Sequence, residues 1–135
     1  MEKTYEIEDV IQALNNLAWE NDITILDIFD LDPTTSDTSI VIMRSVFMNR
    51  NYNRVAYPFR LAHEISHILY GDPSAQSVYH FSEFGKRGEE LQAHKHAISL
   101  LMKIKKPASP LSFMECYKVP AWLDGYVSET FKQLA

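Results

Sequence analysis

The residues of this chain most able to do chemistry are two histidines and a glutamate within His63-Glu64-Ile65-Ser66-His67. On a helix, residues four apart lie one above the other on the same face, so His63 and His67 can direct two imidazoles at one ion. Glu64 lies about 100° round the helix, where its carboxylate can reach a water on that ion. Two neutral histidines and a carboxylate base are typical of a zinc hydrolase.

The sequence around this motif predicts a helix over residues 58–70. Pro58 suits the first turn, and Gly71 followed by Pro73 ends the helix. Apolar side chains recur at helical spacing and predict one buried side, formed by Leu61, Ile65, Ile68 and Leu69. The alternative is that the two histidines are core residues bonded to neighbouring carbonyls, but the adjacent Glu64 and the helix boundaries favour a metal site.

A second helix, expected over residues 89–103, offers the third protein ligand that a zinc hydrolase needs beside an open position for water. One of its faces carries a carboxylate, a histidine and small or apolar residues, namely Glu90, Ala93, His94, Ala97 and Leu101. The alanines indicate close approach to another helix, which would bring Glu90 near the two histidines. The alternative for Glu90 is a first-turn carboxylate stabilised by the helix dipole. Glu89 points about 100° away and is expected to be solvated.

Residues 72–88, a stretch of about 17, are predicted to form a loop between these helices. Loops of this length in a small domain are usually functional or disordered. Tyr79 and His80 lie in it, and either could polarise a substrate carbonyl in a closed site. The alternative, an exposed aromatic and imidazole pair on a mobile loop, is favoured.

The other elements predict an α+β fold in one domain, residues 1–135, with a short two- to three-stranded sheet. Before the motif, the pattern predicts a helix, a strand, a polar loop and two further strands over 6–20, 23–29, 30–39, 40–43 and 46–48. The last strand could instead continue the one before it through a bulge. After the second helix, a short helix over 109–117 begins with Ser109 as its cap, and a final helix begins at Val119-Pro120.

Composition limits the possible partners. No apolar run reaches about 18 residues and the N-terminus lacks an apolar signal region, so neither membrane insertion nor export is expected. The single cysteine, Cys116, excludes an internal disulfide and fits a cytoplasmic protein. The net charge of −5 argues against direct nucleic-acid binding. The two C-terminal helices could mimic a helix-turn-helix, but the second carries Asp124 and Glu129 against Lys132, so DNA binding there is rejected.

Two stretches together resemble the ImmA/IrrE metallopeptidases. Residues 61–69, LAHEISHIL, resemble the L-A-H-E-x-x-H-x-L core of that family, and residues 90–101, ELQAHKHAISLL, resemble its E-x-x-A-N-x-x-A-x-x-L-L helix. The likeness covers most of the chain and extends to the short members carried by phages and integrative elements. The pair of motifs in this order is its specific part. His94 stands where the family usually has Asn, so it could support the metal ligands or compete with them.

The resemblance implies a small zincin-like domain that holds Zn²⁺ through His63, His67 and Glu90. Zinc would lower the pKa of its water towards about 7, and Glu64 would take the proton and pass it to the leaving amine. His94, Tyr79 and His80 are candidates to support the ligands or to stabilise the oxyanion. The expected function is a zinc-dependent endopeptidase that cleaves a cognate helix-turn-helix repressor, of the Xre or CI type, and so derepresses phage or mobile-element genes.

Two other functions stay open at this point. One is a non-proteolytic antirepressor that binds the repressor and in which zinc is structural; the other is a toxin-like hydrolase in a two-gene module. Glu64 favours the enzyme, because a binding module does not need this residue. Residues 46–48 are expected to form an edge strand on which a substrate peptide adds as a further strand.

Overall fold

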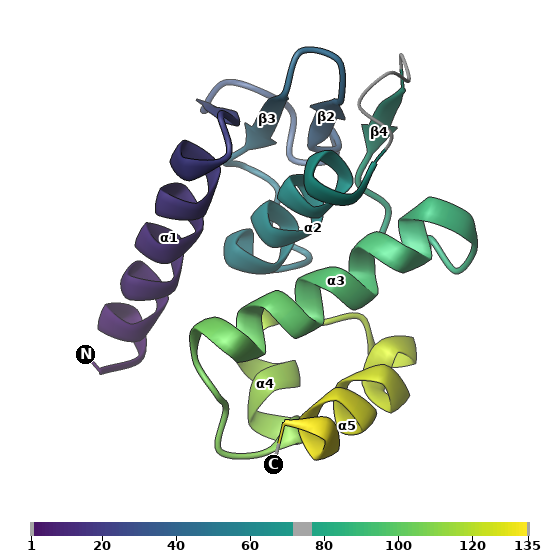
Figure 1. Ribbon diagram of the computed structural model, residues 1–135. Helices are drawn as coiled ribbons and strands as arrows, with labels where there is room; N and C mark the ends of the chain where they lie inside the picture. The colour runs from purple at the N-terminus through teal and green to yellow at the C-terminus, as the bar shows by residue number, and fades with distance from the viewer. Residues whose placement is uncertain (1, 72–76, 135) are drawn as a thin grey trace.

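The computed structural model describes residues 2–71 and 77–134 and confirms the α+β class, with helices packed on a small sheet (Figure 1). The elements, in chain order, are α1 (Glu2–Glu20), β1 (Thr24–Ile28), β2 (Thr38–Ile40), β3 (Ser45–Asn49), α2 (Tyr57–Tyr70), β4 (Val78–His80), α3 (Gly88–Ile104), α4 (Pro110–Tyr117), the short 3-10 helix η1 (Ala121–Leu123) and α5 (Asp124–Gln133). Figure 1 shows the sheet at one end, with α2 beside it, and α4 and α5 beyond α3 at the other end. Across residues 2–71 and 77–134, no helix is both long enough and apolar enough to cross a membrane.

The sheet has four strands in the order β1-β3-β2-β4, so the prediction of two or three strands is corrected to four. β1 pairs with β3 in parallel, and the other two pairings are antiparallel. β3 therefore lies inside the sheet, and the prediction that residues 46–48 form an edge strand is wrong. β1 and β4 are the edge strands, and α3 comes directly after β4 in the chain.

The predicted strand over residues 40–43 is also wrong, because the chain turns there. β2 ends at Ile40, and the turn before β3 is closed by a hydrogen bond from the Arg44 amide to the Val41 carbonyl, 3.0 Å. Arg44 adopts a left-handed backbone with φ of 45°, and its guanidinium donates to the Asn21 carbonyl at 2.6 Å. Ile40 of the predicted strand thus ends β2, whereas residues 41–43 belong to a tight turn between antiparallel strands and not to a strand or a bulge.

The stretch predicted as a loop over 72–88 contains β4. Residues 72–76 of that stretch lie outside the described residues, but Val78–His80 pairs with β2, and His80 faces Thr38 in the register. Three residues are too few for a periodicity signal, and their strand conformation depends on a partner about 40 residues earlier in the chain. The strand changes the positions of Tyr79 and His80, because successive side chains of a strand point to opposite faces.

Helix α2 lies at the centre of the molecule. Its residues from Pro58 to Ile68 are all buried, including the charged ones. The helix packs against the sheet, α1 and α3, so the apolar stripe expected from the sequence covers only part of its buried surface. Because α2 is buried on every side, the polar side chains of its motif are largely shielded from solvent.

A buried ion pair fixes the first turn of α2. Nη1 of Arg60 lies 2.8 and 2.9 Å from the two carboxylate oxygens of Asp37, and the guanidinium also donates to the carbonyls of Val55, Asn49 and Tyr52. Asp37 in turn accepts the amide of Asn49 at 2.7 Å. The two charged side chains are 2% and 0% exposed. This network joins α2 to the end of β3 and to the residue before β2.

The two C-terminal helices predicted from the sequence are present in the structure. Ser109 caps α4 and exchanges hydrogen bonds with Ser112, both at 3.1 Å, which satisfies backbone donors that have no partner within the helix. The last helix begins as the 3-10 turn η1 after Pro120 and continues as α5. Within η1, Trp122 donates its indole N–H to the carbonyl of Glu83 at 2.7 Å, so this end of the chain contacts the segment after β4.

We predict that Arg60→Met lowers the free energy of unfolding by about 3–5 kcal/mol, because it leaves the carboxylate of Asp37 buried without its cation. Urea denaturation followed by circular dichroism measures this change. Arg54→Met is the matched control, since the side chain of Arg54 is 67% exposed and its ion pair with Glu83 is worth less than about 1 kcal/mol. Equal losses in the two variants would show that Arg60 does not hold α2 in place.

Candidate metal centre

Helix α2 places the two motif histidines side by side, as their spacing predicts. The Nε2 atoms of His63 and His67 lie 3.2 Å apart, and the ring centroids are separated by 4.8 Å. His63 is fully buried and His67 is 4% exposed. The geometry follows from the four-residue spacing, because both side chains project from the same face one turn apart.

Helix α3 adds Glu90 to this pair. Its Oε1 lies 3.2 Å from Nε2 of His63, and its Oε2 lies 2.5 Å from Nε2 of His67. The approach is close because α3 faces α2 with buried alanines, Ala93 and Ala97. Gly85 helps in the same way, since a Cβ there would lie only 2.6 Å from the Cβ of Glu90. The three predicted ligands are thus brought together, while their binding of a metal stays a prediction.

The residues present fit a zinc ion. Tetrahedral zinc, with bonds of about 2.0–2.2 Å, separates its ligand atoms by about 3.3 Å. Two of the three separations between ligand atoms, both 3.2 Å, already have this value, and the ligand atoms of His63, His67 and Glu90 all lie within 4.8 Å of one another. Among the described residues this is the group of three or more histidine, cysteine or acidic side chains that could hold a metal ion.

The protonation of these ligands suits a cation. Burial lowers the pKa of His63 to about 3, against the hydrogen bond to Glu90, which raises it, so the imidazole is neutral at neutral pH. Burial raises the pKa of Glu90, but its hydrogen bonds with His63 and His67 outweigh this and bring the pKa down to about 2. A neutral imidazole and an ionised carboxylate are the forms that bind a divalent metal.

Glu64 lies beside the ligand atoms without joining them. Its Oε2 is 3.7 Å from Nε2 of His63, and the side chain is fully buried. Neither carboxylate oxygen hydrogen-bonds to another residue in the described part of the chain. Burial, followed by the charges of Asp37 and Glu90, raises the pKa of Glu64 well above its usual value, and the nearby Ser39 hydroxyl, which lacks full hydrogen-bond geometry, and the charge of Arg60 oppose this rise. A cation on the three ligands would oppose this effect, because a nearby opposite charge favours the ionised form.

His94 packs behind the candidate ligands. Its Nε2 donates to the carbonyl of Ser82 at 2.9 Å, and its ring centroid lies 4.3 Å from that of His63. It does not belong to the group of three. The arrangement favours a supporting role over competition for the metal. Sequence analysis missed the aromatic residues around this ring, Phe59, Phe81 and Trp122.

Of the two candidate residues on β4, Tyr79 contacts the candidate metal ligands and His80 does not. The ring of Tyr79 stacks on that of His67, with centroids 4.0 Å apart, and its hydroxyl donates to Glu89. Burial and this hydrogen bond raise the pKa of Tyr79, so the phenol keeps its proton at neutral pH. His80 is exposed and lies with Thr38, whose hydroxyl is 3.1 Å from its Nδ1. The strand alternation places His80 away from the metal ligands.

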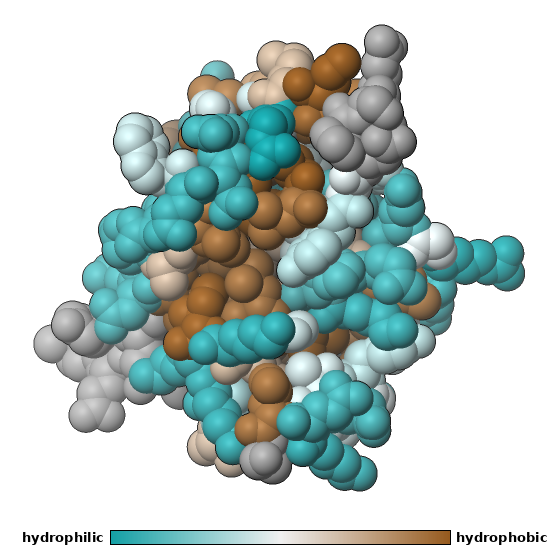
Figure 2. All heavy atoms as spheres, in the orientation of Figure 1, coloured by the Kyte–Doolittle hydropathy of each residue, from teal (hydrophilic) through white to brown (hydrophobic). Residues whose placement is uncertain are grey.

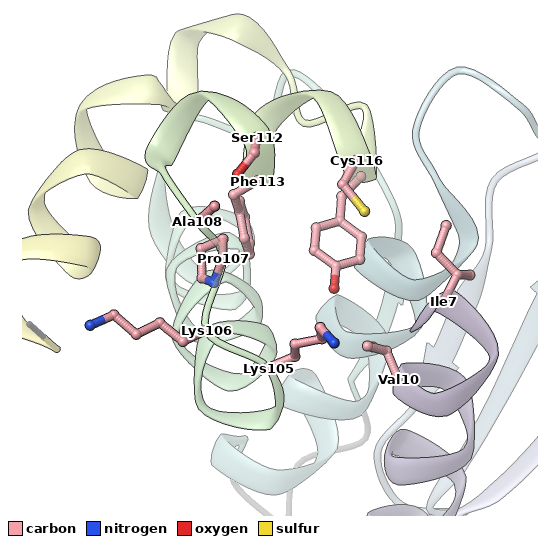
Figure 3. Close-up of a pocket in the computed structure, with 10 residues that line it drawn as sticks. Ile7, Val10, Lys105, Lys106, Pro107, Ala108, Ser112, Phe113 and Cys116 are labelled. Carbon is pink, nitrogen blue, oxygen red and sulfur yellow. The ribbon is translucent and has the colours of Figure 1, made fainter. Parts of the chain in front are cut away.

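Two cavities differ in their relation to these residues. One, of about 260 Å³, adjoins the group and is lined partly by His67 and Tyr79. A larger one, of about 420 Å³, lies between α1, α4 and the segment that links α3 to α4 (Figure 3). Its lining comes from α1, from residues 105–108 and from α4, and includes none of the candidate ligands. Figure 2 shows hydrophobic side chains gathered between α1 and α3 on the visible face. The smaller cavity is therefore the one relevant to the metal centre.

We predict that the protein binds about one zinc ion per chain through three protein ligands. Elemental analysis should show that His63→Ala and Glu90→Gln lose most of the zinc. His80→Ala is the matched control and should keep it, because His80 lies on the other face of the sheet. Full occupancy in both ligand variants would exclude this site, and loss in His94→Ala but not in Glu90→Gln would transfer the third ligand to His94.

We also predict that zinc removal lowers the melting temperature, since an ion bound only by the folded state stabilises it by mass action. Free zinc at about a thousand times its dissociation constant contributes about 4 kcal/mol. For a domain of this size, that corresponds to roughly 10–20 °C, measurable by thermal denaturation with and without chelator. His63→Ala should melt at one temperature under both conditions. An unchanged wild-type melt after verified zinc removal would show that the core alone holds α2 and α3 together.

Comparison of the chain with models of protein families, with curated proteins and with solved structures finds no match. The two motifs and the geometry of their side chains are therefore the basis for any statement about function.

Proposed function

We propose that this protein is a zinc-dependent endopeptidase with a small zincin-like domain. The observation that carries the proposal is the position of Glu64, a fully buried carboxylate 3.7 Å from Nε2 of His63 whose two oxygens have no hydrogen-bond partner among the described residues. A structural zinc site has four protein ligands and needs no such neighbour, whereas a catalytic site has three and an adjacent base. The group of His63, His67 and Glu90 has three.

Each residue has a definite task in this proposal. A zinc ion held by His63, His67 and Glu90 would supply Lewis-acid chemistry to a water molecule and to the peptide carbonyl. The Glu64 carboxylate would accept a proton from the attacking water and return it to the nitrogen of the leaving amine. Tyr79, whose phenol is protonated and lies over His67, is the candidate to donate a hydrogen bond to the carbonyl oxygen, and to do so its single hydroxyl proton would turn from Glu89 to the substrate. His94 holds Ser82 and packs against His63, which restricts the orientation of that imidazole.

The substrate in this proposal is an extended peptide that adds to β4. This strand pairs with β2 on one side and forms an edge of the described sheet on the other. Backbone groups on an edge can hydrogen-bond to an added strand. Tyr79 on β4 is directed at the ligands, so a peptide along this edge would pass beside them. β4 thus takes the role that the sequence suggested for residues 46–48.

The biological substrate we propose is a cognate helix-turn-helix repressor of the Xre or CI type, whose cleavage would derepress the genes of a phage or mobile element. The support is the resemblance of residues 61–69 and 90–101 to the paired motifs of the ImmA/IrrE metallopeptidases. The acidic chain, with a net charge of −5, is consistent with action on the repressor protein rather than on DNA.

One observation favours a second candidate, a non-proteolytic antirepressor with structural zinc. His63 and Glu64 are fully buried and His67 is only 4% exposed, so a peptide reaches them only where Glu90 and Tyr79 are accessible. In that function, the same surface binds the repressor and the ion only joins α2 to α3. The two functions can be distinguished by one product, because only the endopeptidase would produce cleaved repressor.

We predict that Glu64→Gln keeps the zinc content, the fold and repressor binding, and slows cleavage by about two to four orders of magnitude. Glutamine has nearly the same shape as glutamate but cannot accept the proton of water. Cleavage of the cognate repressor is followed on gels for the wild type, the variant and the chelated wild type at equal concentrations.

Glu115→Gln provides the control, because it makes the same chemical change at an exposed position of α4. It should cleave at the wild-type rate. Release of the repressor from its operator is measured in parallel. If the wild type, Glu64→Gln and chelated wild type all release the repressor equally and none cuts it, the antirepressor is the correct function.

A further inference from the structure

The cavity beside the metal centre has a composition that suits one class of side chain. It encloses about 260 Å³, and its walls come from the end of α2, from β4 and from the first turns of α3. The described residues that line it include His67, Tyr70, Tyr79, Glu89 and His96. Because His67 is itself a candidate ligand, a side chain in this cavity would belong to a residue next to the bond that is cut.

Glu89 is the one acidic side chain among these lining residues. Its Oε2 accepts a hydrogen bond from the hydroxyl of Tyr79, which holds the carboxylate at the cavity. A carboxylate has about four lone-pair positions, so this bond leaves room for a second donor. A fixed carboxylate at the wall favours a cationic guest over an anionic one.

Another part of the lining is aromatic. The rings of Tyr70 and His96 stack with centroids 3.9 Å apart and an interplanar angle of 14°. Burial, followed by Lys103 and Lys95, lowers the pKa of His96, so its ring is neutral at neutral pH. Lys95 itself is directed at the ring of Tyr126, 4.8 Å away. Flat neutral rings suit the methylene chain of a long cationic side chain and attract its charged end.

We propose that this cavity receives a lysine or arginine side chain adjacent to the scissile bond and that Glu89 sets this preference. The proposal rests on the endopeptidase function and names the class of peptide that the same site accepts. Glu89 is thus a specificity residue, distinct from the neighbouring Glu90, which binds the metal. The gain for a cation is modest, because Glu89 is exposed and water screens the pair.

The preference is measured by binding, which needs no turnover. Two dipeptide hydroxamates, identical except for lysine or the neutral norleucine, are titrated calorimetrically into the zinc-loaded full chain. The wild type should bind the lysine ligand about fivefold more tightly, the gain expected from one exposed ion pair and one aromatic contact. Glu89→Gln should bind both ligands equally. Tyr79→Phe keeps the carboxylate and should keep most of the preference, and Glu115→Gln should keep all of it.

Cleavage of a peptide library by the wild type, read by mass spectrometry, distinguishes this proposal from the endopeptidase itself. Enrichment of lysine and arginine at one position beside the cut, lost in Glu89→Gln, supports it. Cleavage without that enrichment, equal binding of the two ligands by the wild type, or an unchanged preference in Glu89→Gln overturns it. A lysine preference in binding with no cleavage of any peptide supports the cavity and overturns the endopeptidase, while binding of neither ligand overturns both.

Discussion

The ion pair of Arg60 with Asp37 is the interaction on which the rest of this structure depends. Two charges removed from water must stay paired, because breaking such a pair costs more than forming it gains. α2 can therefore take only the position at which Arg60 meets Asp37, just before β2. β2 then carries β4, and β4 places Tyr79 over His67. The ion pair thus fixes the position of α2, which carries the two histidines, relative to β4, which carries Tyr79.

The centre itself combines small residues with charges that are costly to bury. Ala93 and Gly85 allow the approach of the segments around Glu90, and that approach puts ionisable groups within a few ångströms of one another. Such groups are unfavourable in an interior unless each has a partner. A divalent cation, if bound as we propose, would supply a partner to several of them at once. Stability and the proposed chemistry would then depend on the same atoms, and functional sites commonly carry local costs of this kind.

The bounds of the helices could be predicted from the sequence, whereas those of the short strands could not, and the reason is physical. Helical periodicity and caps such as Ser109 are local signals, so α1, α2, α3 and α4 were predicted close to their true bounds. β2 and β4 have three residues each, and distant partners decide their conformation. For the same reason, Tyr79 and His80 could not be distinguished until a strand gave them opposite faces. The approach of Glu90 was suggested by spacing, but only helix packing placed it beside the histidines.

The order of the ligands along the chain has a consequence for biosynthesis. Glu90 follows His67 by 23 residues, which a ribosome adds in about 1–5 s. During that time, the nascent chain has both imidazoles but no carboxylate to complete the set, and two ligands hold zinc weakly. A full set exists only after α3 has folded against α2. If the protein binds zinc as we propose, metal acquisition would be a late event in maturation, and an incomplete chain released from the ribosome would lack the full set of candidate ligands.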